Sequence, residues 1–212
     1  MAVQNTRPST LPQAHSGLAE RFQIVTTRVS VAGFELDLAH PASADDLIDE
    51  VEFNRDERLP YWADIWPSAR VLARHIAGSE GRGRRLLDLG CGVGLAALAA
   101  ARGGYQVVAS DYYFAALEFV ELNAERNGLS GIETRMIDFR SLPDDSGRFD
   151  VVAAADVLYE RAYARHIAHA FARLLKPGGV GFLTDPDRRS ADPFAQECQR
   201  RGLEAKRVAT SV

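Results

Sequence analysis

The sequence predicts a doubly wound, mostly parallel α/β sheet with helices on both faces. Three observations support this fold class. A short apolar run over 86–89 breaks into closely spaced glycines and is followed by an Ala- and Leu-rich stretch over 95–102. Further apolar runs of strand length alternate with stretches of helical spacing towards the C-terminus. Acidic residues stand at or near the ends of several of these runs. The length of 212 residues suits one such domain with a small N-terminal addition.

Composition excludes several classes of protein. The net charge of −4 and the pI of about 5.8 give no global basic field that would draw the chain to nucleic acid or membranes. The two cysteines, Cys91 and Cys198, form neither a disulfide framework nor a zinc-spacing cluster, so we expect no metal site. The first twenty residues lack an apolar run, and no stretch is long enough to span a bilayer. We therefore expect a cytoplasmic protein in a reducing setting.

The N-terminal part is predicted to precede the main domain. Residues 1–20 are polar and contain two prolines, which predicts disorder. Residues 21–58 are predicted to form an N-terminal extension. Within it, alternation around Ala32-Gly33 indicates a hairpin over 22–38, and an acidic stretch over 45–53 indicates a short helix. The main domain is predicted to occupy residues 59–212.

The main domain is expected to alternate helices with strands. A helix over 67–77 has Pro67 in its first turn and Gly78 as its end. The other expected helices are 95–102, 113–127, one that ends before Lys176, and one from Asp192-Pro193 to Gly202. The expected strands are 86–89, 106–110, 132–136, 149–155, 180–184 and 203–210. Right-handed crossovers then place the carboxyl ends of the parallel strands at one edge of the sheet.

The turn after the first of these strands carries the strongest signal. Asp88 precedes glycines at alternate positions, Gly90, Gly92 and Gly94. Glycines allow a sharp turn and a close approach of the backbone to a ligand, and the following helix start offers free N–H groups. A dinucleotide-binding turn would need its third glycine at position 95, where the chain has Leu95, which counts against an NAD-dependent oxidoreductase. A purely structural turn is the alternative reading.

Acids follow the later strands as well. Asp111 lies about 20 residues after the glycine turn, where this fold places a carboxylate on ribose hydroxyls, although it is also suited to capping the next helix. Asp138 and Asp156 follow the next two strands. We expect these acids and Asp88 to meet at the carboxyl edge of the sheet, because packing alone does not explain four such placements.

Both tryptophans of the chain lie in one loop ahead of the glycine turn. Trp62 and Trp66 fall in the stretch 59–67. An isolated tryptophan is usually a core residue, whereas two beside a nucleotide site favour a cover over the ligand. The sequence leaves both readings open.

Taken together, residues 61–212 resemble the class I (seven-strand) S-adenosylmethionine-dependent methyltransferases, whose sheet is Rossmann-like. Three stretches resemble more narrowly the protein-lysine methyltransferase branch that includes the electron-transfer-flavoprotein β-subunit lysine methyltransferases. They are Pro60 to Pro67, the Asp156-Val-Leu-Tyr159 turn, and Asp185-Pro-Asp-Arg188. The branch usually has glycine where this chain has Asp187. The family's seventh strand has no counterpart before Val212, so the resemblance leaves it missing.

The resemblance implies S-adenosylmethionine as cofactor and no metal. The residues that it assigns to the cofactor are Trp66, Asp88, Gly90, Gly92, Asp111, Asp138 and Phe139. Asp88 and the backbone of Gly90 and Gly92 would hold the methionine end, and Asp111 would bind the ribose. Asp138 and Phe139 would bind and flank the adenine, and Trp66 would cover the cofactor. Asp156 and Tyr159 would line the acceptor site and take the catalytic positions.

The expected reaction is N-methylation of a lysine side chain of a protein substrate, with a small-molecule amine as the alternative acceptor. Nucleic acid is not expected as partner, because the fourth strand of the sheet ends in Ala-Asp-Val-Leu-Tyr rather than the Asn/Asp-Pro-Pro-aromatic turn of base methylation, and no basic stripe is present. An NAD-dependent oxidoreductase and a non-catalytic cofactor-binding module are the remaining alternatives.

Overall fold

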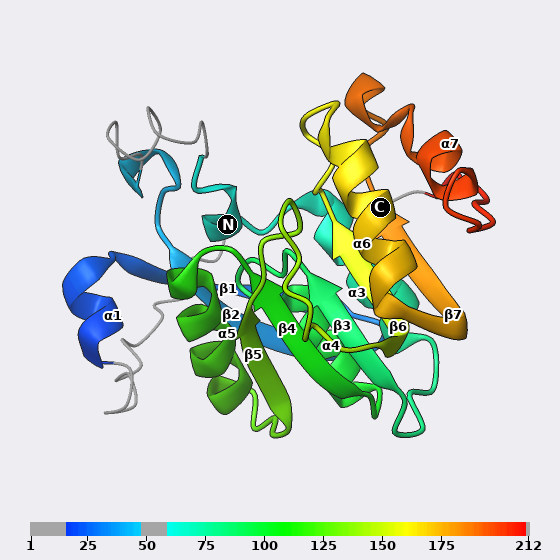
Figure 1. Ribbon diagram of the computed structural model, residues 1–212. Coiled ribbons are helices and arrows are strands. Elements are labelled where there is room, and N and C mark those ends of the chain that lie inside the picture. The colour runs from blue at the N-terminus through cyan, green and yellow to red at the C-terminus, as the bar shows by residue number, and fades with distance from the viewer. Residues whose placement is uncertain (1–15, 48–58, 211–212) are drawn as a thin grey trace.

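The computed structural model describes residues 16–47 and 59–210, and its centre is a five-stranded parallel sheet (Figure 1). The strands lie in the order β5-β4-β3-β6-β7. Their bounds are β3 (Arg85–Leu89), β4 (Gln106–Asp111), β5 (Ile132–Met136), β6 (Phe149–Ala155) and β7 (Leu175–Thr184). The chain order reverses between β3 and β6, which is where this fold opens a crevice at the carboxyl ends of the strands. The predicted fold class is confirmed.

Helices cover both faces of the sheet. They are α3 (Pro67–Ala77), α4 (Leu95–Arg102), α5 (Phe114–Arg126), α6 (Tyr163–Leu174) and α7 (Phe194–Gln199). Figure 1 shows α6 in front of the sheet and α3 and α4 behind it. Successive residues of β3 point to opposite faces, so Leu86 packs with α3 and α4 while Leu87 packs with α6. A strand covered on both sides is largely apolar, which is why β6 is an unbroken apolar run after Asp150.

The predicted N-terminal hairpin is confirmed. Strands β1 (Ile24–Val31) and β2 (Phe34–Pro41) pair antiparallel around Ala32 and Gly33, which both have positive φ. Ahead of it, α1 (Ser16–Arg21) overlaps the end of the segment predicted to be disordered, and its Leu18 is buried. After the hairpin, Asp45–Leu47 form a short 3-10 helix, η2. The rest of the predicted acidic helix lies outside the described residues.

The C-terminal strand prediction is wrong. Residues 203–210, predicted as a sixth strand, form no strand in the structure, and the described chain runs from β7 through the 3-10 helix η4 (Arg189–Ala191) and α7. Leu203 closes the end of α7, where its N–H donates to the Cys198 carbonyl at 3.1 Å. Most of the residues beyond it are charged or exposed, and they pair with no strand of the sheet.

Strand β7 also begins five residues earlier than predicted. It starts at Leu175, and a register irregularity opposite Phe149 and Val151 accommodates the Lys176–Gly179 stretch.

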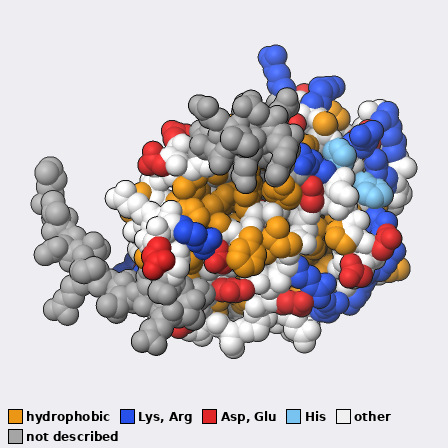
Figure 2. Space-filling view, turned by 60° about the vertical axis from the view of Figure 1, so that its left-hand side comes forward, with side chains coloured by type: hydrophobic (Ala, Val, Ile, Leu, Met, Phe, Trp, Pro, Cys, Tyr) orange, Lys and Arg blue, Asp and Glu red, His pale blue; other side chains and the backbone are white. Residues whose placement is uncertain are grey.

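Among the described residues, no helix is long and apolar enough to cross a membrane. Figure 2 shows a face on which hydrophobic side chains gather near the centre, with acidic and basic side chains around them.

Candidate active site

A cavity of about 250 Å³ opens at the carboxyl edge of the sheet, lined from the loops after β3, β4, β5 and β6 and from the segment before α3. The fold brings together every residue that the sequence predicted for the site. Those lining the cavity include Trp66, Asp88, Gly90, Gly92, Asp111, Asp138, Phe139, Asp156 and Tyr159. The grouping follows from the topology, because parallel strands end at the same edge.

The glycine turn after β3 is a close-fitting cradle. Gly90, Gly92 and Gly94 have φ of +72°, +52° and +92°, which L side chains rarely adopt. A Cβ on Gly92 would lie 3.0 Å from the Trp62 carbonyl oxygen, and one on Gly94 would lie 2.9 Å from a Val120 methyl. Other residues would therefore strain or displace the turn, and the backbone here can approach a ligand directly.

Asp88, near the end of β3, is a buried carboxyl group beside this turn. Its side chain is almost wholly buried, and Oδ2 has no hydrogen-bond partner among the described residues. Burial raises the pKa of Asp88 to about 7, with a further rise from the charge of Asp111, although a backbone hydrogen bond from Ala97 opposes it. A buried carboxyl oxygen without a partner on the wall of a cavity is a place for a cationic or N–H-bearing ligand group.

Asp111 connects the glycine turn to the start of α5. Its Oδ2 accepts the N–H of Gly92 and its Oδ1 accepts the N–H of Tyr113, both at 3.0 Å. The contact with Tyr113 is a local turn ahead of α5, and the start of α5 has no side-chain cap, so the alternative of Asp111 as helix cap is wrong. Asp111 ends β4 and lines the cavity, which is where this fold places the carboxylate that accepts ribose hydroxyls. Ribose binding by Asp111 stays a prediction.

The loop after β5 places Asp138 and Phe139 on another wall of the cavity. Asp138 accepts the N–H of Arg140 at 2.9 Å, and the Arg140 Nε lies 3.4 Å from the same carboxylate. The Phe139 ring lies edge-on to Tyr163 of α6, with centroids 5.2 Å apart. An acid next to a half-buried aromatic ring on the cavity wall is compatible with the predicted adenine site, which stays a prediction.

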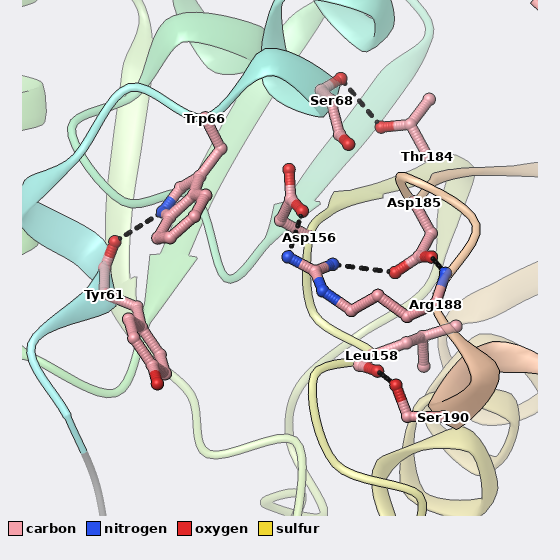
Figure 3. A network of polar contacts seen from close by, with 9 residues as sticks. All are labelled: Tyr61, Trp66, Ser68, Asp156, Leu158, Thr184, Asp185, Arg188 and Ser190. Atoms are coloured by element: carbon pink, nitrogen blue, oxygen red, sulfur yellow. Dashed lines mark hydrogen bonds and ion pairs between the residues drawn. The ribbon is translucent and has the colours of Figure 1, made fainter.

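The two tryptophans have different roles. Trp62, in the 3-10 helix η3 (Tyr61–Ala63), is buried and packs against Phe22 and Phe119 at centroid distances of 5.9 and 5.8 Å. Trp66 is half-buried, lines the cavity, and donates its Nε1–H to the Tyr61 carbonyl at 2.8 Å (Figure 3). Both tryptophans line the cavity, but Trp62 is buried among core side chains, so the less buried Trp66 is the better placed of the two to cover a ligand.

A row of aromatic rings follows from Trp66 along the cavity. Tyr61 contacts Trp66 and Tyr159 at centroid distances of 5.8 and 5.1 Å, and Tyr159 contacts Tyr163 at 5.0 Å. Burial and the neighbouring Tyr163 raise the pKa of Tyr159 far above its usual value. The Tyr159 hydroxyl is thus protonated at neutral pH and is able to donate a hydrogen bond but not to act as a base. Sequence reasoning had not placed Tyr61 and Tyr163 in the site.

Asp156, directly after β6, is held by an arginine that the sequence analysis had not placed in the site. Its backbone has a φ of +59° and its Oδ1 lies 2.7 Å from Nη2 of Arg188. Arg188 in turn donates Nη1–H to Asp185 at 2.9 Å and its backbone N–H to the other Asp185 oxygen at 2.7 Å (Figure 3). The signal was present in the Asp185-Pro-Asp-Arg188 stretch. Asp187 has a φ of +69°, which explains why glycine is usual there.

Comparisons with known proteins agree with this geometry. Residues 87–183 match the family described as "Methyltransferase domain". The electron transfer flavoprotein beta subunit lysine methyltransferase of Xenopus laevis is 31% identical over 153 residues, which cover 65% of this chain and 60% of that protein. A ubiquinone biosynthesis O-methyltransferase of Alkalilimnicola ehrlichii is 39% identical over 109 residues, covering 51% and 43%. The chain spans about half the length of the curated relatives it matches.

A solved structure shares the fold. The 16S rRNA guanine-N2 methyltransferase of T. thermophilus, in complex with AdoMet and guanosine, matches with a TM-score of 0.62 and 21% identity, over 85% of this chain and 46% of that one. The site described above fits the cofactor of this family, S-adenosylmethionine, on two observations: the Asp88 oxygen without a partner suits a cationic ligand group, and the glycine cradle admits a ligand where a Cβ would not. Together, the matched methyltransferase domain, the relatives and the shared fold support a class I S-adenosylmethionine-dependent methyltransferase.

Proposed function

We propose that this chain is an N-methyltransferase that methylates a lysine side chain of a protein. The observation that carries the proposal is the position of Asp156. Its carboxylate is buried, lines the cavity, and has an Oδ2 with no partner among residues 16–47 and 59–210. Tyr61 and Tyr159 stand on the same cavity wall. A carboxylate oxygen beside aromatic rings suits an amine on an apolar stem, because the rings pack on methylene groups and the oxygen accepts an N–H hydrogen bond.

The chain's own residues supply positioning and a dry surrounding. S-adenosylmethionine, when bound, supplies a methyl group already activated on a sulfonium. The glycine turn and Asp88 would hold the cofactor on one side, while Asp156 and Tyr159 would orient the amine on the other; alignment of this kind is the main catalytic term. A lysine with a pKa of about 10.4 must lose a proton first, and a cavity walled by aromatic rings lowers an amine's pKa by disfavouring its charge.

One of two groups of relatives supports a protein acceptor. One group of matched proteins is described as lysine methyltransferases of electron transfer flavoprotein and another as ubiquinone biosynthesis O-methyltransferases. A quinol-type acceptor would need its hydroxyl deprotonated, and a buried carboxylate disfavours a second negative charge beside it. The acid at the acceptor wall therefore favours nitrogen over oxygen.

The test follows label from methyl-labelled S-adenosylmethionine into a cell extract, with the purified protein added. Asp156→Asn keeps the size of the side chain and removes the charge, and Asp192→Asn, an exposed acid outside the cavity, is the matched control. We expect a discrete labelled protein band, methyl-lysine in its hydrolysate, a loss of at least about tenfold for Asp156→Asn, and no change for Asp192→Asn, since general positioning effects reach this size.

Other outcomes would overturn the proposal. Label confined to small molecules would assign an amine metabolite as acceptor, and alkali-labile label would assign an oxygen acceptor. No transfer by a protein that still binds the cofactor would leave a non-catalytic binding module.

A further inference from the structure

Three charged side chains at the acceptor wall form one network, Asp156–Arg188–Asp185. The guanidinium of Arg188 lies between the two carboxylates, at 2.7 Å from Asp156 and 2.9 Å from Asp185. The side chains of Asp156 and Asp185 are only 6% and 8% exposed, so both charges depend on the arginine for compensation. Figure 3 shows Arg188 reaching from the loop after β7 towards Asp156 at the end of β6.

The two carboxylate oxygens of Asp156 differ in their partners. Oδ1 is paired with Arg188, whereas Oδ2 has no partner among the described residues and belongs to a side chain that lines the cavity. An uncompensated buried carboxylate would favour the ammonium form of an incoming amine, which has no lone pair to donate. A carboxylate whose charge is compensated still accepts an N–H hydrogen bond but favours the ammonium form much less.

We propose that Arg188 is a positioning residue that sets the charge of the acceptor site, so that Asp156 holds the acceptor amine in its neutral form. The inference rests on the proposed function. The amine lone pair then forms the new N–C bond while the S–C bond breaks and its electron pair stays on sulfur. The methylated ammonium afterwards gives one proton to solvent. Arg188 touches neither reactant in this account and acts through Asp156.

Other charges around the cavity do not replace Arg188 in this role. The other charged side chains that line it are Asp64, Asp88, Asp111, Asp138 and Arg140. Arg140 is paired with Asp138, in the loop after β5. The tyrosines that face the acceptor wall are Tyr61, Tyr159 and Tyr163. Arg188 is thus the only cation for which the described residues show an ion pair with Asp156.

The first test uses two variants with opposite expected effects. Asp185→Asn leaves Arg188 and removes one negative charge, so the midpoint of the pH–rate profile should fall by about one pH unit. The double variant Arg188→Gln with Asp185→Asn leaves Asp156 uncompensated, so the midpoint should rise by about one pH unit. Arg188→Lys should stay near the wild-type midpoint, and Arg189→Gln, an exposed neighbour outside the cavity, is the control. The acceptor is the protein band labelled in the extract.

A second readout does not require turnover. Calorimetry measures the affinity of n-butylamine, which is a cation at neutral pH, for protein saturated with S-adenosylhomocysteine. We expect the double variant to bind it about tenfold more tightly than wild type and Asp185→Asn to bind it more weakly, since one pKa unit corresponds to a tenfold change. Near-ultraviolet circular dichroism reports whether each variant is folded.

The outcomes separate the two proposals. Unchanged midpoints, or midpoints that move in the same direction in both variants, would overturn the role of Arg188 even if lysine methylation holds. Equal n-butylamine affinities in wild type and the double variant would overturn it as well. If wild type labels no amine but the order of n-butylamine affinities is as expected, the proposed function fails and the charge-setting role of Arg188 stands.

Discussion

At the scale of single residues, two tryptophans four positions apart differ in burial: both line the cavity, but Trp62 is also packed into the core. Trp62 is 8% exposed and packs against Phe22 and Phe119, whereas Trp66 lines the site and packs edge-on against Tyr61. Both stand in the same loop, so their spacing alone could not distinguish them. Trp62 lies in η3, whereas Trp66 directly precedes α3, and the tertiary contacts at these two places decide how far each side chain is buried.

This difference predicts that one alanine variant loses mainly stability and the other mainly cofactor affinity. Trp62→Ala should lower the free energy of unfolding by about 3–5 kcal/mol, the usual cost of removing a buried aromatic side chain. Trp66→Ala should leave the melting temperature within a few degrees of wild type and weaken S-adenosylmethionine binding. Thermal melts and calorimetric titration of both variants measure this. Equal losses of stability in the two variants would contradict the assignment of Trp66 to the ligand cover.

At the scale of elements, helix α5 joins the N-terminal hairpin to the glycine turn through one buried amide. The Asn123 side chain accepts the N–H of Ala39 at 2.6 Å, and its Nδ2 donates to the carbonyls of Ala39 and Val93, both at 2.9 Å. The hairpin thus does more than cover the sheet: its strand β2 and the glycine turn share one hydrogen-bonding side chain. Asn127, one turn later, binds Asp37 of β2 but not the glycine turn.

Leucine substitutions at these two asparagines separate the contributions. Asn123→Leu leaves three buried backbone groups without their partner, so we expect a loss of stability of about 3 kcal/mol or more, because each unsatisfied group costs about 1–3 kcal/mol. It should also weaken S-adenosylmethionine binding, since the Val93 carbonyl is no longer held. Asn127→Leu, the matched control, should lower stability while the cofactor affinity of the folded protein is unchanged. Chemical denaturation and calorimetry together would show either pattern, and a similar affinity loss in both would contradict the link to the turn.

How far the sequence predicts an element depends on whether the signal is local. The glycine turn, the strand-end acids and α4 follow from residues within one unit, and the structure has them at the predicted positions. Residues 203–206 alternate apolar and polar side chains, but the adjacent Lys206 and Arg207 break the pattern. Strand formation also needs a partner, and the segment is mostly exposed instead. Arg188 was missed for a related reason: it pairs with Asp156 only because β6 and β7 are neighbours in the sheet.

At the scale of the whole molecule, one buried carboxyl group in the ligand site lowers the stability of the fold when it is ionised. Asp88 is buried beside a neighbouring acid, and burial raises its pKa from 3.8 to about 7. The native state therefore binds a proton more readily than the unfolded chain between these two values. The contribution of Asp88 to the free energy of unfolding is therefore most favourable below pH 3.8. It falls as the pH rises, and the favourable part is lost once the pH has passed about 7. A cationic ligand group beside the carboxylate would offset this cost.

The neutral, isosteric variant Asp88→Asn tests this coupling. Relative to wild type, the ligand-free variant should gain stability as the pH rises from about 4 to 8, by at most about 4 kcal/mol, because one pKa unit corresponds to 1.36 kcal/mol. The gain should shrink or reverse when S-adenosylmethionine is added, since the variant lacks the negative charge that the cofactor's cationic groups would neutralise. Denaturant unfolding of both proteins across this pH range, with and without cofactor, measures the two effects. A stability difference that does not vary with pH would place the cost elsewhere, and equal stabilisation of both proteins by the cofactor would remove Asp88 from its binding site.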